Sequence, residues 1–224
     1  MNMKTGIKYN MGCGSIRPEG WINVDSSVTS LVRRLPYGQS IVSKFGKKKV
    51  VGAPVVYMNL SNKWRGIGDQ TAEIVYASHL FEHITLKGRT VFLREAFRVL
   101  KPGGVIRLVV PDLELHARNY IHDLDQGNTK ANEQFLWSLN LHREGQYPSG
   151  KKIHQFLGYL QGYPHQHKYM YDQYSLSELL TKCGFTQIQK SNFGESHYSE
   201  AIREVEYNTD LSYGSSLYLE AIRP

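Results

Sequence analysis

Long apolar runs, cysteines and targeting features are scarce in this sequence. No run of about 18 apolar residues occurs, so no helix is expected to cross a membrane. The chain begins M-N-M-K-T-G and enters an apolar segment almost at once, which leaves no room for a signal peptide. Its two cysteines, Cys13 and Cys183, are too few for a disulfide framework. We therefore expect a cytoplasmic protein in a reducing environment.

Acidic residues are outnumbered. The chain has 27 Lys and Arg against 20 Asp and Glu, a formal net charge of +7 and a pI of about 9.3. This balance permits an acidic partner such as a phosphorylated substrate, an anionic glycan or nucleic acid. The basic residues are dispersed, with a cluster at 47–49 and a pair at 151–152, so a solvated basic surface is the simpler interpretation. The length of 224 residues, without internal repeats or a linker, predicts one globular domain.

The stretch Y-N-M-G-C-G-S-I-R-P-E-G-W-I-N-V-D, residues 9–25, organises the rest of the chain. It predicts a strand, a glycine-bearing turn and a second strand that ends at Asp25. Gly12 and Gly14 let the backbone turn sharply and approach a ligand closely. Asp25 can accept hydrogen bonds from a vicinal diol, as an acidic residue does for the ribose of a nucleotide. The stretch therefore predicts a nucleotide site.

The connection between these two strands is unusually short. Only nine residues, Gly12 to Gly20, separate them, and Pro18 is among the nine. A parallel crossover normally takes a dozen or more residues and a helix. We therefore expect the first crossover helix to be short or absent, and the turn amides together with Asp25 to bind the ligand in its place.

Apolar patterning predicts alternating strands and helices. The apolar run at 55–58 predicts a strand buried on both faces. Residues 90–100 repeat with the helical period and end at K-P-G-G. Residues 175–178, S-L-S-E, predict a capping box that starts another helix. The other strands are expected at 7–11, 21–24, 73–77, 105–110, 185–189 and 217–222, and further helices at 28–35, 112–123 and 129–141, with 40–49 ambiguous.

This order predicts an α/β protein with a mostly parallel sheet covered by helices on both faces. Ligands of such sheets bind beyond the carboxyl ends of the strands, near the switch in strand order. Polar and glycine residues follow five of the predicted strands, so segments far apart in sequence are expected to meet at one rim. They are Gly12 and Gly14, Asp25, Asn59, Ser78 and His79, and Pro111 and Asp112.

The order of motifs resembles the class I S-adenosylmethionine-dependent methyltransferases, and most closely their type 11 group. The resemblance rests on N-M-G-C-G, G-W-I-N-V-D, M-N-L, V-Y-A-S-H-L-F-E-H-I and R-V-L-K-P-G-G-V-I-R-L-V-V-P-D, and it runs through most of residues 7–190. It implies a Rossmann-like, doubly wound sheet of seven strands with the last strand antiparallel. It also implies S-adenosylmethionine as cofactor and a single domain over residues 1–224. Members of this group often act on glycans or other small metabolites.

The resemblance also implies a set of cofactor-binding residues. Gly12, Cys13 and Gly14 would pass around the amino-acid part of the cofactor, and Asp25 would hold the ribose hydroxyls. Asn10, just before the turn, also belongs to the set. Asn59, where the group more often has Asp, would border the adenine with Leu60, and Ser78 and His79 would lie beside the methionine end. An NAD enzyme fits poorly, because Arg17 stands where its third glycine belongs and Asp25 follows Gly14 too closely.

Methyl transfer is an in-line displacement with a neutral leaving group, so positioning and exclusion of water matter most. A hydroxyl nucleophile would also benefit from a general base. The candidates near the rim are His79, Asp112, His116 and His167. Residues 112–172, rich in His and Tyr, are expected to form a substrate-facing cap insertion. These features favour O-methylation of a small molecule or glycan.

Three alternatives stay open. The positive charge suits an RNA methyltransferase, although no RNA-binding domain is appended and S-H-L-F stands where enzymes acting on exocyclic amines have N-P-P-Y. A non-catalytic cofactor-binding module would keep the fold without turnover. Residues 79–83, H-L-F-E-H, match the H-x-x-E-H pattern of inverted zinc peptidases. The methyltransferase resemblance already accounts for that run, so no metal is expected.

Overall fold

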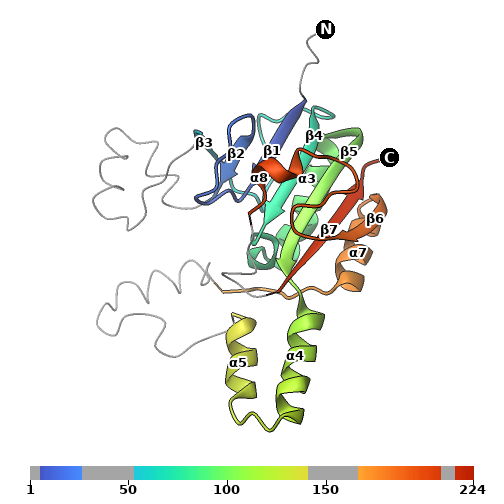
Figure 1. Ribbon diagram of the computed structural model, residues 1–224. Coiled ribbons are helices and arrows are strands. Elements are labelled where there is room, and N and C mark those ends of the chain that lie inside the picture. Colours follow the sequence, from blue (N-terminus) through green and yellow to red (C-terminus); the bar gives the residue numbers. More distant parts are fainter. Residues whose placement is uncertain (1–5, 27–52, 141–165, 208–214) are drawn as a thin grey trace, which may run out of the picture.

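The computed structural model of the protein describes residues 6–26, 53–140, 166–207 and 215–224 (Figure 1). The helix expected at 28–35, the ambiguous segment 40–49 and residues 141–165 of the expected cap lie outside these residues. In the part of the chain that is described, no helix is long and apolar enough to cross a membrane.

A seven-stranded sheet forms the centre of the molecule, with the strand order β3-β2-β1-β4-β5-β7-β6. Strands β1 to β5 pair in parallel, while β7 runs antiparallel to both β5 and β6. The expected doubly wound sheet with an antiparallel last strand is therefore confirmed. Its strands are β1 (Ile7–Met11), β2 (Ile22–Asp25), β3 (Val55–Tyr57), β4 (Ala72–Ser78), β5 (Leu100–Pro111), β6 (Thr186–Ser191) and β7 (Ser216–Ile222).

The expectation of full burial was wrong for β3. This strand pairs only with β2 at the edge of the sheet, and Val56 is 46% exposed. A short apolar run is consistent with burial on both faces but does not establish it, because an edge strand can have the same composition.

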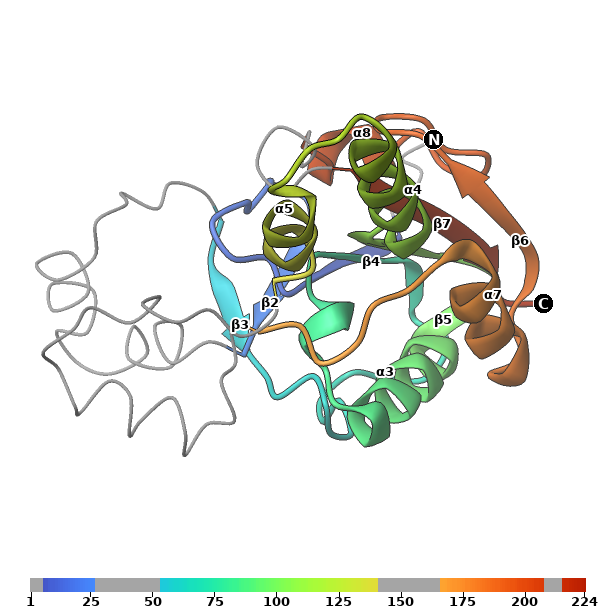
Figure 2. The same cartoon turned by 90° about the horizontal axis from the view of Figure 1, so that it is seen from below.

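Helices α3 (Leu86–Val99) and α7 (Gln173–Lys182) cover one face of the sheet (Figure 2). The buried residues of α3 recur at helical spacing, and Leu176 and Leu180 of α7 join the same apolar core. The Thr85 side chain caps α3 by accepting a hydrogen bond from the Gly88 amide. The capping box of α7 lies about one turn earlier than predicted, because Asp172 and Ser175 form it rather than Ser175 and Glu178.

The opposite face shows the effect of the short first connection. Residues 12–21 contain no helix, as expected from their number. The short helix α8 (Ile202–Val205), which the sequence did not predict, lies on this face instead (Figure 2). Ile202 and Val205 pack with Trp21, Ile74 and Tyr76 in a second apolar cluster. Segments from the two ends of the chain therefore replace the missing helix together.

A buried ion group ties this covering segment to the sheet. Arg107 on β5 is fully buried, and its Nη2 lies 2.7 Å from Oε2 of Glu206. Its Nη1 lies 3.3 Å from Oε1 of Glu220, which is its register partner on β7. The same guanidinium donates to the carbonyl oxygens of Asn192 and Glu195, so its charge and its donors are both satisfied.

Helices α4 (Leu113–Asp125) and α5 (Ala131–Ser138) extend beyond the carboxyl ends of the central strands (Figure 1). They pack against each other, and the rings of Tyr120 and Phe135 stack with centroids 4.8 Å apart. A 3-10 turn, η1 (Phe81–His83), follows β4 at the same end of the sheet.

Candidate functional site

The turn after β1 adopts the left-handed backbone that its glycines favour. Gly12 has φ of +73° and Gly14 has φ of +51°. A Cβ on Gly12 would lie 3.0 Å from the Leu80 side chain, whereas one on Gly14 would meet nothing within 4 Å. The backbone of Gly14 therefore borders open space, where a ligand can approach it closely.

Replacing Gly12 with alanine is expected to destabilise the fold by about 1–2 kcal/mol for the left-handed backbone alone, plus the cost of displacing Leu80. Gly127, between α4 and α5, is the matched control, because it has φ of +72° and no neighbour within 4 Å. Urea denaturation of both variants measures the difference. An equal loss of stability at the two positions would show that the Leu80 contact contributes nothing.

The turn amides are less available than expected. The backbone N–H groups of Gly12 and Cys13 both donate to the carbonyl oxygen of Val24, at 2.8 and 3.0 Å. The expectation that turn amides bind the ligand was therefore wrong for these two, because they hold β1 to β2 instead. Burial raises the pKa of the Cys13 thiol to about 11, so this cysteine is not a reactive nucleophile.

The Asn10 side chain stabilises the turn through two hydrogen bonds. The side chain is 3% exposed, and its amide donates to the carbonyl of Ile16 and to Oδ1 of Asn23. The structure therefore places Asn10 where it shapes the turn.

Asp25 lies at the carboxyl end of β2. Asn59 and Leu60, the residues expected near the adenine, differ in exposure. Asp25 is half-buried and its register partner on β3 is Tyr57. Asn59 is exposed, and its Oδ1 accepts a hydrogen bond from the Ser61 amide at 3.0 Å. Leu60 is 2% exposed and belongs to the core, so its side chain does not border the rim.

The carboxyl end of β4 supplies Ser78. Its hydroxyl oxygen is buried and makes no hydrogen bond of good geometry among the described residues, although the Tyr76 hydroxyl lies near it. Since β4 pairs with β1 up to Met11 and Ala77, Ser78 lies beside the glycine turn. A buried hydroxyl next to a glycine turn and the end of β2 fits a polar ligand with an amino-acid part and a diol, as S-adenosylmethionine has.

His79 follows directly and has an unusual backbone. Its φ of +46° is uncommon for a residue with a Cβ, and such strain is concentrated at functional sites. Its ring lies between two polar groups, with Nδ1 3.2 Å from Oε1 of Glu82 and Nε2 3.3 Å from Oγ of Ser216. The ring is therefore already engaged on both sides.

Glu82 is the centre of a buried polar cluster. Its side chain is fully buried, and Nε2 of His83 and Nε2 of His167 lie 3.9 and 4.0 Å from its Oε1. Burial alone would raise the pKa of Glu82, but the hydrogen bond and charge of His79 and the charge of His83 hold it below the usual value. Burial lowers the pKa of His167 to about 4, so this ring is neutral at pH 7. The cluster unites two candidates, His79 and His167, around a carboxylate that sequence reasoning did not single out.

The two other candidates lie on α4. Asp112 caps this helix, because its Oδ1 accepts from the Leu115 amide, and its Oδ2 lies 3.4 Å from Nζ of Lys190. His116 is buried one turn later, and its Nε2 has no hydrogen-bond partner among the described residues. Burial lowers the pKa of His116 below its ordinary value, against the opposing charge of Asp112. His116 is therefore a neutral imidazole at pH 7 whose buried Nε2 is unpartnered among the described residues.

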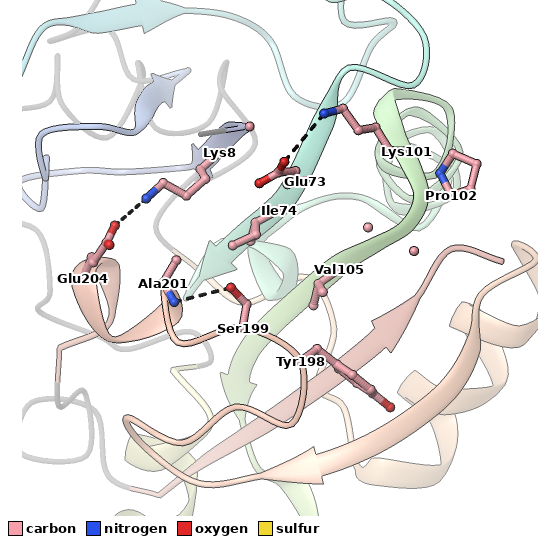
Figure 3. A pocket seen from close by; sticks show the side chains of 13 residues that line it. Lys8, Glu73, Ile74, Lys101, Pro102, Val105, Tyr198, Ser199, Ala201 and Glu204 are labelled. Atoms are coloured by element: carbon pink, nitrogen blue, oxygen red, sulfur yellow. Dashed lines mark hydrogen bonds and ion pairs between the residues drawn. The ribbon is translucent and has the colours of Figure 1, made fainter. Parts of the chain in front are cut away.

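A surface hollow of about 510 Å³ lies at the other end of the sheet (Figure 3). It is lined by the amino-terminal ends of β1 and β4, where Lys8 pairs with Glu204 and Lys101 pairs with Glu73. Ligands of parallel sheets bind at the carboxyl ends, so this hollow is not the candidate site.

Comparisons with known proteins agree with this geometry. Residues 11–108 match the family model described as "Methyltransferase domain". No curated protein matches the sequence. A SAM-dependent methyltransferase from Thermotoga maritima aligns with a TM-score of 0.51 and 15% identity, over 100% of this chain and 84% of its own. One from Archaeoglobus fulgidus aligns with a TM-score of 0.50 and 15% identity, over 98% and 86%. At these identities the structural likeness establishes the fold alone.

Proposed function

We propose that the protein is a class I S-adenosylmethionine-dependent methyltransferase that methylates a hydroxyl group of a small molecule or glycan; the match of residues 11–108 to the methyltransferase family model supports this. S-adenosylmethionine is the cofactor, and it supplies the methyl group on a sulfonium. The observation that carries the proposal is the shared rim of β1, β2 and β4. A glycine turn, the Asp25 carboxylate and the buried Ser78 hydroxyl lie at their carboxyl ends.

Each part of this rim has a role that its chemistry suits. Asp25 accepts hydrogen bonds from the two ribose hydroxyls, and Ser78 bonds the amino-acid part of the cofactor. The open backbone at Gly14 lets that part approach closely. Asn59 borders the adenine through its amide, and Leu60 through its backbone. Asn10 and Cys13 act indirectly, because their bonds hold the turn in shape.

The acceptor side of the site is proposed to be the cap, residues 112–172. Helices α4 and α5 extend beyond the strand ends, where an acceptor would face the cofactor (Figure 1). His116 is the favoured base among the four candidates, because it is neutral and its buried Nε2 is unpartnered among the described residues. Asp112 caps α4 and holds the start of that helix, while His79 and His167 are occupied with Glu82. A proton acceptor of this kind supports a hydroxyl nucleophile.

Replacing Asp25 with alanine is expected to weaken binding of S-adenosylmethionine about 100-fold, more than any single change within the cap. Charge-assisted hydrogen bonds to a carboxylate contribute about 1.5–3 kcal/mol. Calorimetric titration with S-adenosylmethionine and S-adenosylhomocysteine measures the change. Asp125→Ala, an exposed aspartate at the end of α4, is the control and should bind as the wild type does. Equal affinity in the Asp25 variant would refute its placement, and no binding of either ligand by the wild type would refute the proposed function.

Transfer of a labelled methyl group then identifies the acceptor class. Label in sugars or other hydroxyl compounds supports the proposal. Label in RNA, with binding that weakens steeply as salt rises, would favour RNA methylation instead. Tight cofactor binding without transfer to any acceptor would indicate a non-catalytic module.

A further inference from the structure

The buried cluster around Glu82 has the composition of a metal site. One oxygen of Glu82 and one nitrogen each of His83 and His167 lie within 4.8 Å of one another. Glu82 and His83 lie on η1, directly after β4, and His167 comes from the segment that precedes α7. Two histidines and one carboxylate form a ligand set that binds divalent metal ions, zinc in particular.

The hydrogen bonds of the two histidines fix which nitrogen faces the carboxylate. Nδ1 of His83 lies 3.2 Å from the backbone carbonyl oxygen of Gln166, so this nitrogen carries the proton. The other nitrogen, Nε2, faces Glu82 and is the one placed to bind a metal ion. Nδ1 of His167 contacts Sδ of Met170 at 3.2 Å, and its Nε2 also faces Glu82. A backbone carbonyl behind one ring nitrogen is the usual partner of a metal-binding histidine.

The carboxylate has few donors for a fully buried group. Among the described residues its side-chain donor is His79, whose Nδ1 lies 3.2 Å from Oε1. The two Nε2 atoms lie 3.9 and 4.0 Å from Oε1, too far for hydrogen bonds, so a cation placed between these three atoms would compensate the buried carboxylate.

We propose that Glu82, His83 and His167 bind one zinc ion. With metal–ligand bonds of about 2.0–2.1 Å, tetrahedral ligand atoms lie about 3.3 Å apart. The observed separations of 3.9 and 4.0 Å then need small side-chain movements to close. His79 or a water molecule completes the fourth position.

The ion would fasten the end of the cap to the cofactor-binding half of the sheet. The amides of Lys168 and Tyr169 already donate to the carbonyl oxygen of Glu82, at 2.7 and 3.3 Å. His83 and Gln166 are 83 positions apart in the sequence, so a metal bridge here closes a long loop. Binding to the folded state alone then raises its stability. The metal site does not depend on the proposed methyl transfer.

The test uses the full chain without an affinity tag, dialysed against a chelator and then titrated with ZnCl₂ in a calorimeter. We expect one zinc ion per chain and a higher melting temperature with zinc. Cobalt(II) added in place of zinc should give the visible absorption of a tetrahedral site. Removing a residue that only hydrogen-bonds a metal ligand usually weakens metal binding about 10–100-fold. His167 is a ligand itself, so His167→Gln should weaken zinc binding by at least about 100-fold.

His122→Gln, on the exposed side of α4, is the control and should bind zinc as the wild type does. If His167→Gln fails to fold, His83→Gln replaces it, since the His83 side chain is 25% exposed. Wild-type protein that binds no zinc, or a folded ligand variant that binds it equally well, would overturn the proposal. Cofactor titration of the same samples separates this result from the proposed function.

Discussion

Replacing Arg107 with methionine is expected to destabilise the protein by about 3–5 kcal/mol, the usual cost of removing one partner from a buried ion pair. The guanidinium is fully buried and contacts the carboxylates of Glu206 and Glu220. Methionine fills much of the same volume but leaves both carboxylates without their cation. Urea denaturation followed by circular dichroism measures the loss. A loss of stability below about 1 kcal/mol would mean that the buried ion group of Arg107, Glu206 and Glu220 contributes little to stability.

The stability lost on replacing Arg107 with methionine should also depend on pH. Burial already raises the pKa of Glu206 above its ordinary value, and the charge of Arg107 opposes this rise. Without Arg107 the pKa of Glu206 rises further, so the folded state binds a proton that the unfolded state has lost. Stability then falls as pH rises from the ordinary pKa of a glutamate toward the raised value. We expect a smaller loss at pH 5 than at pH 8, and no measurable change at either pH for the exposed control Arg118→Met.

Replacing His116 with glutamine is expected to lower the rate of methyl transfer about 10²–10⁴-fold, the usual contribution of a general base. Cofactor affinity should stay unchanged, because His116 lies on the acceptor side. His122→Gln on the same helix is the matched control. Single-turnover transfer of labelled methyl to the acceptor gives the rate. A variant with the wild-type rate would exclude His116 as the base.

The pH profile adds a readout that a structural role would not give. The pKa of His116 is lowered by burial, against the charge of Asp112, which itself pairs with Lys190. At pH 7 the His116 ring is therefore almost entirely in its neutral form, which can accept a proton. This form is lost only as the pH falls below the ordinary pKa of a histidine. The wild-type rate should show this acid limb, and the His116→Gln rate should lack it.

Much of the fold could be predicted because its signals are local. Apolar segments separated by glycine and proline residues predicted all seven strands. The connection of only nine residues between Met11 and Trp21 predicted that the first crossover helix is short or absent. The errors have physical causes. The capping box was misplaced because Asp172 and Ser175 are both good N-cap types. Helix α8 has only four residues, too few for a periodic pattern.

The site was predictable only where its residues end strands. Gly12, Asp25 and Ser78 meet at one rim because parallel strands share one carboxyl edge. The Val24 carbonyl that binds the turn amides gave no signal, since backbone groups have no sequence pattern. The motif at 79–83 was visible, but its partner His167 comes from a distant segment whose position depends on tertiary packing.

Coverage of the sheet by α8 has a consequence for the order of folding. Glu204 contacts Lys8 and Trp21 across 196 and 183 positions of the sequence. Such contacts close very long loops, so they form late and slow the search for the native state. Trp21, Ile74 and Tyr76 therefore stay without the cover of Ile202 and Val205 until this late segment has docked. We expect residues 11–108 alone, which match the methyltransferase family model, to expose this apolar cluster.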